Sequence, residues 1–214
     1  CNDCGAEFSR WQGQCSACKA WNTISEVRLI SSSNSTKNDR FSGYAGETRA
    51  KIQTLSEISL QETPRFTSGF KELDRVLGGG IVPGSAILIG GHPGAGKSTL
   101  LLQVMCGLAK NMTALYVTGE ESLQQVAMRA NRLNLPTDKL NMLSETSVEQ
   151  ICNLADQLKP QIIVVDSIQV MHLSDIQSSP GSVAQVRECA SFLTRYAKTR
   201  QVAIIMVGHV TKDG

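Results

Sequence analysis

The sequence predicts an α/β fold with a mainly parallel sheet, preceded by a small cysteine-rich domain. From about residue 66, apolar runs typical of buried strands alternate with amphipathic segments typical of helices. A Gly-x4-Gly-Lys-Ser run at residues 91–98 lies between the first such strand and the first such helix. Four of the seven cysteines fall within the first 18 residues. We therefore expect a cysteine-rich domain over 1–22, a flexible linker over 23–65 and the α/β domain over 66–214.

The predicted linker is identified by its composition. Residues 31–50 are rich in serine, glycine, asparagine and charged residues, with no apolar period. The 214 residues suffice for one α/β domain and a small appendage. The chain opens with Cys1 instead of methionine, so we expect a fragment of a longer protein.

Charge and hydropathy exclude some classes of function. The net charge of +2 is too weak to indicate nucleic-acid binding by itself. No apolar run reaches the roughly 20 residues that a membrane span needs. No signal peptide opens the chain. We expect no membrane association and a cytoplasmic location.

The predicted elements follow one another in a regular alternation. Strands are predicted at 86–90, 113–118, 140–143, 161–166 and 202–207, and helices at 97–110, 122–133, 148–158 and 183–197. The strands at 161–166 and 202–207 are continuously apolar. That pattern favours a parallel sheet covered by helices on both faces.

The glycine-rich run has the sequence and the context of a phosphate-binding P-loop. Its glycines let backbone N–H groups turn towards phosphate oxygens, and the following helix adds positive potential at its N-terminus. Lys97 is expected to reach the β- and γ-phosphates and to assist catalysis, and Ser98 to hold magnesium. The predicted ATP-binding residues are Gly91, His92, Pro93, Gly94, Ala95, Gly96, Lys97, Ser98 and Thr99.

Acidic residues follow two of the predicted strands. Asp166 ends the strand IIVVD, where a carboxylate beside the P-loop is expected to complete the magnesium site. The alternative role for Asp166 is a helix cap. Glu120 and Glu121 follow the strand TALYVT, and we expect Glu120 to be the catalytic carboxylate that activates water. Both glutamates would also be favourable as acids at a helix start.

His209 follows the strand VAIIMVG. A polar residue at this strand end is placed to sense the γ-phosphate and to move a neighbouring loop. The alternative is a structural histidine.

The N-terminal cysteines form two Cys-x2-Cys pairs, Cys1 with Cys4 and Cys15 with Cys18. Four thiolates close a tetrahedral zinc site, and metal binding would supply the folding free energy that so short a segment lacks. A redox dithiol pair is the alternative. Trp11 and Trp21 are expected to pack over the metal site, the alternative being that they stack on bases. Cys106, Cys152 and Cys189 are expected to be small buried hydrophobes.

These motifs together resemble the RadA (Sms) family of bacterial DNA-repair ATPases, within the RecA superfamily. The resemblance covers residues 1–214 and is carried by RWQGQC, AWNT, GGHPGAGKST, YVTGEES, VVDSIQV and VGHVTKDG. It implies a RecA-like P-loop ATPase core with Gly91–Ser98 as Walker A and Asp166 as Walker B. The post-strand glutamate of the family falls on Glu120, and the zinc cysteines fall on Cys1, Cys4, Cys15 and Cys18.

The resemblance also implies a function. Members assemble as rings, bind single-stranded DNA and recombination intermediates, act with a RecA-type recombinase and promote branch migration in homologous recombination. By analogy with RecA-type proteins, the loop at 171–181 is expected to contact DNA, although a plain surface loop is the alternative. Arg187, Arg195 and Lys198 lie near one face of the next helix, where DNA contact, a solvated face or a contact between subunits explains them equally well.

Two departures from the family are visible. His92 stands where the family often has aspartate or asparagine, with little expected effect. The KNRFG motif and the Lon-protease-like domain of the family do not occur in this chain, so we expect it to hydrolyse ATP poorly by itself. A KaiC-like nucleotide-gated signalling ATPase with a zinc docking module remains the alternative function.

Overall fold

A computed structural model describes residues 1–6, 8, 12–24, 54, 56 and 64–210. Most of the predicted linker over 23–65 therefore lies outside the described residues. The strands are β1 (Ala86–Gly91), β2 (Ala114–Thr118), β3 (Asn141–Ser144), β4 (Ile162–Asp166) and β5 (Ala203–His209). The helices are α1 (Lys71–Val76), α2 (Lys97–Leu108), α3 (Leu123–Arg132), α4 (Val148–Leu158) and α5 (Val183–Arg200), and a 3-10 helix, η3, spans Ile168–Val170.

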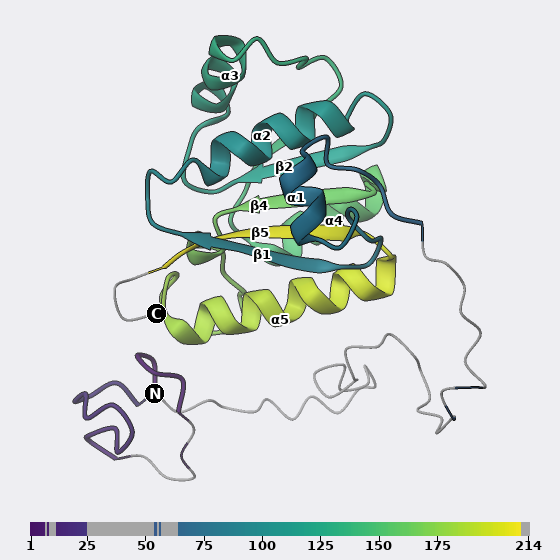
Figure 1. Ribbon diagram of the computed structural model, residues 1–214. Helices are drawn as coiled ribbons and strands as arrows, with labels where there is room; N and C mark the ends of the chain where they lie inside the picture. Colours follow the sequence, from purple (N-terminus) through teal and green to yellow (C-terminus); the bar gives the residue numbers. More distant parts are fainter. Residues whose placement is uncertain (7, 9–11, 25–53, 55, 57–63, 211–214) are drawn as a thin grey trace.

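The five strands form one sheet in the order β1-β5-β4-β2-β3, and every neighbouring pair is parallel. The predicted fold class, an α/β domain with a mainly parallel sheet and helices between the strands, is confirmed (Figure 1). Strands β2 and β4 are buried along their whole length, as their continuous apolar sequences predict.

Two apolar cores lie on opposite faces of the sheet. On one face, Leu101 and Met105 of α2 and Val126 of α3 pack against Tyr116 and Val164 of the central strands. On the other face, Ile151 of α4 and Leu193 of α5 pack against Val117 and Val165. In Figure 1, α2 and α3 lie above the sheet and α5 lies below it. Successive side chains of a strand point to opposite faces of the sheet, so each strand contributes residues to both cores.

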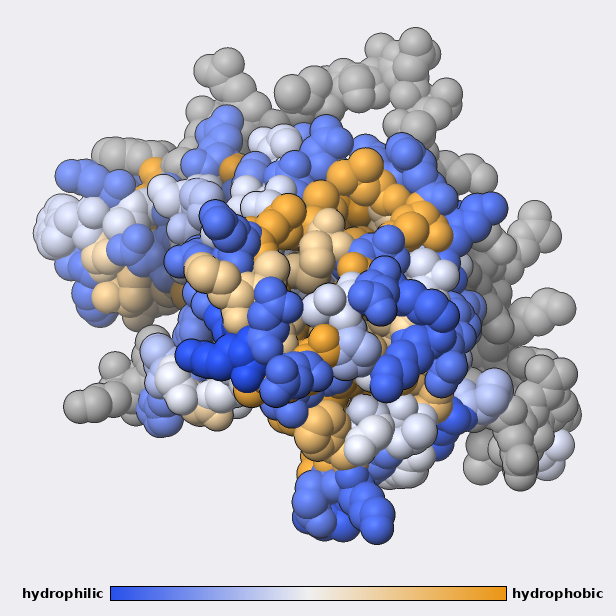
Figure 2. All heavy atoms as spheres, turned by 90° about the horizontal axis from the view of Figure 1, so that it is seen from above, coloured by the Kyte–Doolittle hydropathy of each residue, from blue (hydrophilic) through white to orange (hydrophobic). Residues whose placement is uncertain are grey.

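Part of the outer surface is apolar. Seen from above the view of Figure 1, apolar side chains gather near the middle of this face and hydrophilic side chains surround them (Figure 2). Helix α3 is amphipathic, but only Val126 and Ala130 are buried, and it leaves Leu123 and Met128 exposed.

None of the described helices is long and apolar enough to cross a membrane.

The scattered cysteines are buried, as predicted. Cys106, Cys152 and Cys189 are exposed by 1%, 7% and 0%. Burial raises the pKa of the Cys152 and Cys189 thiols to about 12 and also raises the pKa of Cys106. These three thiols therefore stay protonated and behave as small apolar side chains.

Candidate nucleotide site and metal centre

The predicted site residues converge because all the parallel strands end at one edge of the sheet. Register pairs Thr118 with Asp166 across β2 and β4, and Gly91 with His209 across β1 and β5. The P-loop follows β1, His209 ends β5, Asp166 ends β4 and Glu120 follows β2. This is the edge at which open parallel sheets bind ligands. His209 was expected to follow its strand, but β5 extends further and includes it.

The P-loop joins β1 to α2 through left-handed glycines. Gly94 has φ +80° and Gly96, which precedes the first residue of α2, has φ +84°. A Cβ atom would strain both turns. Lys97 is nearly buried, and its Nζ donates hydrogen bonds to Gly91 O at 2.6 Å and His92 O at 2.9 Å. Its ammonium group has three donors, so these two bonds fix its position and leave one donor for a phosphate oxygen.

Asp166 lies at the centre of this edge with an exposure of only 9%. Its Oδ2 accepts a hydrogen bond of 2.6 Å from the hydroxyl of Tyr116. Ser98 is half-buried at the second position of α2. A carboxylate and a serine hydroxyl are hard oxygen ligands of the kind that magnesium takes beside nucleotide phosphates, so the donor set fits that ion.

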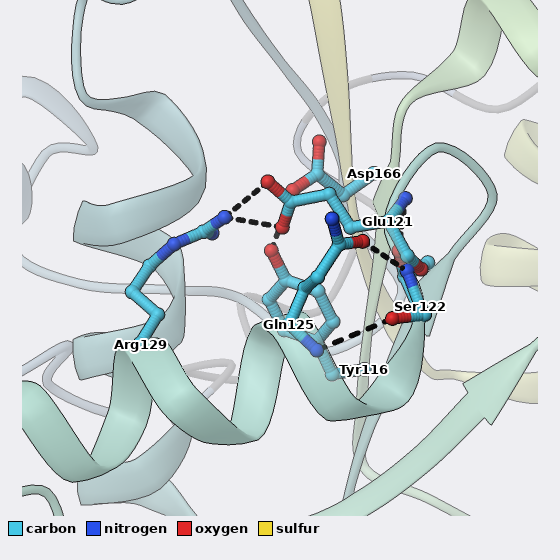
Figure 3. A network of polar contacts seen from close by, with 7 residues as sticks. Tyr116, Glu121, Ser122, Gln125, Arg129 and Asp166 are labelled. Atoms are coloured by element: carbon cyan, nitrogen blue, oxygen red, sulfur yellow. Dashed lines mark hydrogen bonds and ion pairs between the residues drawn. The ribbon is translucent and has the colours of Figure 1, made fainter.

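Glu120 and Glu121 have different partners. Glu120 Oε1 accepts a hydrogen bond from Ser167 Oγ and lies 3.3 Å from His209 Nε2. Glu121 pairs through both carboxylate oxygens with Arg129 of α3 (Figure 3). Helix α3 is capped by Ser122, whose hydroxyl accepts from Gln125 N, so neither glutamate is its cap. Glu120 thus contacts Ser167 and His209, whereas Glu121 is held by Arg129 beside Asp166.

Sequence reasoning did not identify Tyr116, Arg129 or Ser167 as site residues. Tyr116 and Arg129 come from the middle of a strand and a helix, and their side chains meet Asp166 and Glu121 at the sheet edge (Figure 3). A buried tyrosine in an apolar strand carries no signal of its own. Ser167 directly follows Asp166 in the strand-end sequence VVDS. Of the three residues, it is the one whose position in the sequence indicates that it lies at the site.

The loop after β4 is more firmly held than its polar sequence predicts. Met171 and Leu173 are buried, and His172 pairs with Ser147 beside the sheet. Gln185 of α5 is 2% exposed, and its amide bonds to the backbone of Leu173, Ile176 and Ser178. The exposed part of the expected DNA loop thus begins at residue 174. Arg187 and Lys198 of α5 are exposed.

The four N-terminal cysteines meet as predicted. The Sγ atoms of Cys1, Cys4, Cys15 and Cys18 all lie within 4.8 Å of one another, with Cys1–Cys18 at 3.7 Å and Cys4–Cys15 at 3.6 Å. Tetrahedral zinc with Zn–S bonds of about 2.3 Å places sulfurs about 3.8 Å apart, so the cluster fits zinc. The backbone N–H of Cys18 is the main cause that lowers the pKa of Cys15, to about 7. The lowered pKa favours the thiolate of Cys15, whereas contacts with Cys4 and Cys15 raise the pKa of Cys18.

The tryptophans do not both follow the expectation of packing over the metal. Trp21 is 69% exposed, so that prediction is wrong for Trp21. It forms a single antiparallel bridge with Gln14, which holds its backbone and leaves the ring outside. Trp11 lies outside the described residues.

The amino-acid sequence of this chain matches known protein families. Residues 49–214 match the family described as AAA domain, and residues 1–26 match the rubredoxin metal binding domain. The chain belongs to the AAA domain family. Over all of its residues it is 94% identical to DNA repair protein RadA of Haemophilus influenzae, 73% to that of Escherichia coli and 46% to that of Bacillus subtilis.

These matches confirm the resemblance to the RadA (Sms) family inferred from the motifs. They also confirm a RecA-superfamily type of α/β core joined to a four-cysteine zinc ribbon. The chain spans about half the length of the curated relatives it matches, 46% of the Haemophilus influenzae protein and 47% of the Escherichia coli protein.

Proposed function

We propose that this chain is the ATP-hydrolysing part of a DNA-dependent motor of the RadA type. The observation that carries the proposal is the sheet edge where the P-loop with Lys97, Asp166 and Glu120 follow neighbouring parallel strands. Relatives that are named DNA repair proteins match over the full chain. In the cytoplasm, the motor would act on single-stranded DNA and recombination intermediates and promote branch migration beside a RecA-type recombinase.

Each group at the edge has one task in phosphoryl transfer. The residues from Gly91 to Thr99 would cradle the triphosphate, with Lys97 stabilising charge on the β- and γ-phosphates. Ser98 and Asp166 would hold magnesium, which neutralises charge on the phosphates when bound. Glu120 would orient and deprotonate the attacking water. His209 contacts Glu120 and would report loss of the γ-phosphate to β5.

DNA contact and assembly belong to the same proposal. Residues 174–181 follow the Walker B strand and η3, so a shift at Glu120 and Ser167 would be transmitted to this loop. The exposed Arg187 and Lys198 of α5 support contact of this helix with DNA phosphates.

Assembly into a ring is supported by the exposed Leu123 and Met128 of α3, which a second copy of the chain would bury.

The decisive experiment measures the ATPase rate of the full-length protein with and without single-stranded DNA. We expect stimulation by DNA that weakens as salt rises, because phosphate contacts release counterions. An ATPase rate that DNA leaves unchanged at every salt concentration contradicts the motor. That outcome would favour the KaiC-like alternative, in which nucleotide gates a signalling module and the zinc ribbon docks a protein.

Variants test the residue roles separately. Lys97→Ala should abolish binding of ATP with magnesium. Glu120→Gln should keep nucleotide binding but slow hydrolysis by about 10²–10⁴-fold, because it removes the base. Glu121→Gln is the matched control and should slow hydrolysis far less, since Arg129 already neutralises that carboxylate. A larger loss of hydrolysis with Glu121→Gln than with Glu120→Gln would show that Glu121, and not Glu120, activates the water.

A further inference from the structure

In residues 114–117 of β2, the hydroxyl of Tyr116 is the one polar side-chain group, and the other side chains are apolar. Its side chain is fully buried, and it packs in the core with Val164, its register partner on β4. A phenylalanine would fill this space without burying a hydroxyl that must then find a partner. The hydroxyl therefore needs an explanation beyond packing.

The hydroxyl reaches forward along the strand to the nucleotide edge. It donates to Asp166 Oδ2 at 2.6 Å, a short distance typical of a bond to a carboxylate. Within the part of the chain that the structure describes, no other hydrogen bond to this carboxylate is found. A phenol is protonated at neutral pH and an ionised carboxylate only accepts, so Tyr116 is the donor in this bond.

We propose that Tyr116 is a positioning residue for the magnesium site: its hydroxyl holds one oxygen of Asp166 and turns the other towards the ion. The inference rests on the proposed function, because it presupposes that Asp166 acts on magnesium. A carboxylate held by one oxygen cannot rotate freely about its terminal torsion, so less entropy is lost when the ion binds.

Arg129 keeps the second nearby carboxylate away from this task. It pairs with both oxygens of Glu121, so Glu121 is neutralised beside Asp166 instead of competing for the same cation (Figure 3). The edge thus has one carboxylate held by a neutral donor and one neutralised by a cation. Only the first keeps its charge available for magnesium.

The test is Tyr116→Phe in the full-length protein, with binding of a fluorescent ATP analogue titrated by magnesium. We expect unchanged affinity without magnesium, because the P-loop is untouched. The half-saturating magnesium concentration should rise about tenfold, since a hydrogen bond to a charged group is lost. In hydrolysis, kcat at limiting magnesium should fall and recover as magnesium is raised.

Tyr196→Phe is the matched control. The Tyr196 hydroxyl also donates to a carboxylate, Asp156 Oδ1 at 2.8 Å, but between α4 and α5, where neither residue belongs to the site. This variant should keep the magnesium requirement of the natural protein. Melting temperatures of both variants show that each is folded.

A double-mutant cycle with Asp166→Asn separates the possible failures. If Tyr116 acts through Asp166, Tyr116→Phe should change the magnesium requirement no further when Asp166→Asn is present. A normal magnesium requirement in Tyr116→Phe, together with a raised one in Asp166→Asn, overturns the inference alone. A normal requirement in Asp166→Asn overturns the proposed magnesium site and the inference with it.

Discussion

At the residue scale, Gly119 fixes the position of the loop that carries Glu120, the residue proposed to activate water. It joins β2 to Glu120, and its N–H donates to Asp166 O at 2.9 Å. A Cβ at this position would lie 2.5 Å from Val170 Cγ2 and 2.9 Å from Met171 Cε, both packed beneath the loop. The close approach of the loop to η3 thus requires glycine.

Gly119→Ala should therefore destabilise the protein by about 1–3 kcal/mol through overpacking. Since the displaced loop carries Glu120, hydrolysis should fall by about tenfold or more while ATP binding is kept. Urea unfolding and steady-state ATPase rates measure the two effects. Gly107→Ala is the control: that glycine lies in α2 with open space at its Cβ, so alanine should stabilise the protein by about 0.5–1 kcal/mol. Equal responses of the two variants would contradict the account.

The two groups of site residues differ in how far sequence could predict them. Lys97, Asp166 and Glu120 each lie in a short motif attached to a strand end, so their positions follow from the parallel sheet. Tyr116 and Arg129 reach the site through side chains whose partners lie 50 and eight residues away in the chain. Such pairings depend on how α3 packs over the sheet, which no local pattern specifies.

At the element scale, three helices begin with the same local arrangement. The side chains of Ser122, Ser147 and Ser182 cap α3, α4 and α5, each accepting from the N–H of a glutamine three residues on. Such caps satisfy orphan N–H groups and explain why the helix starts are close to those predicted. Helix α1 and η3, with six and three residues, are too short to show a periodicity, and sequence analysis missed both.

The glutamine of α5 has a second task, which gives a prediction. Gln185 is buried and supports the loop after β4 with bonds to Leu173, Ile176 and Ser178. Gln185→Ala would leave several buried backbone groups unpaired, so we expect a loss of about 3 kcal/mol. Urea unfolding measures the loss, and limited proteolysis should show faster cleavage within 174–181. If this loop contacts DNA, stimulation of the ATPase by single-stranded DNA should also fall.

Gln150 offers the matched control for Gln185. It occupies the equivalent third position of α4, but its side chain is exposed. Gln150→Ala should change stability by less than about 0.5 kcal/mol, as is usual for exposed sites. A loss as large as that of Gln185→Ala would show that the helix position, and not the support of the loop, is responsible.

At the scale of the whole molecule, the cysteine-rich N-terminal domain and the α/β domain gain stability from different sources. The α/β domain has two apolar cores on the faces of its sheet. Among the described residues of 1–24, only Cys15 is buried. A segment with so little buried apolar surface needs metal to fold, because burial cannot offset its conformational entropy.

Substitution of cysteines in the two domains should therefore give opposite results. Cys15→Ser should release zinc, measured by a colorimetric chelator, and should leave the thermal unfolding of the ATPase domain in place. Cys106→Ser should keep zinc but lower that melting temperature by about 4–8 °C, because it buries an unpaired hydroxyl in the core. If Cys15→Ser also lowered the melting temperature of the ATPase domain, the ribbon would have to contribute to that core. The same zinc content in Cys15→Ser and the natural protein would remove Cys15 from the metal site.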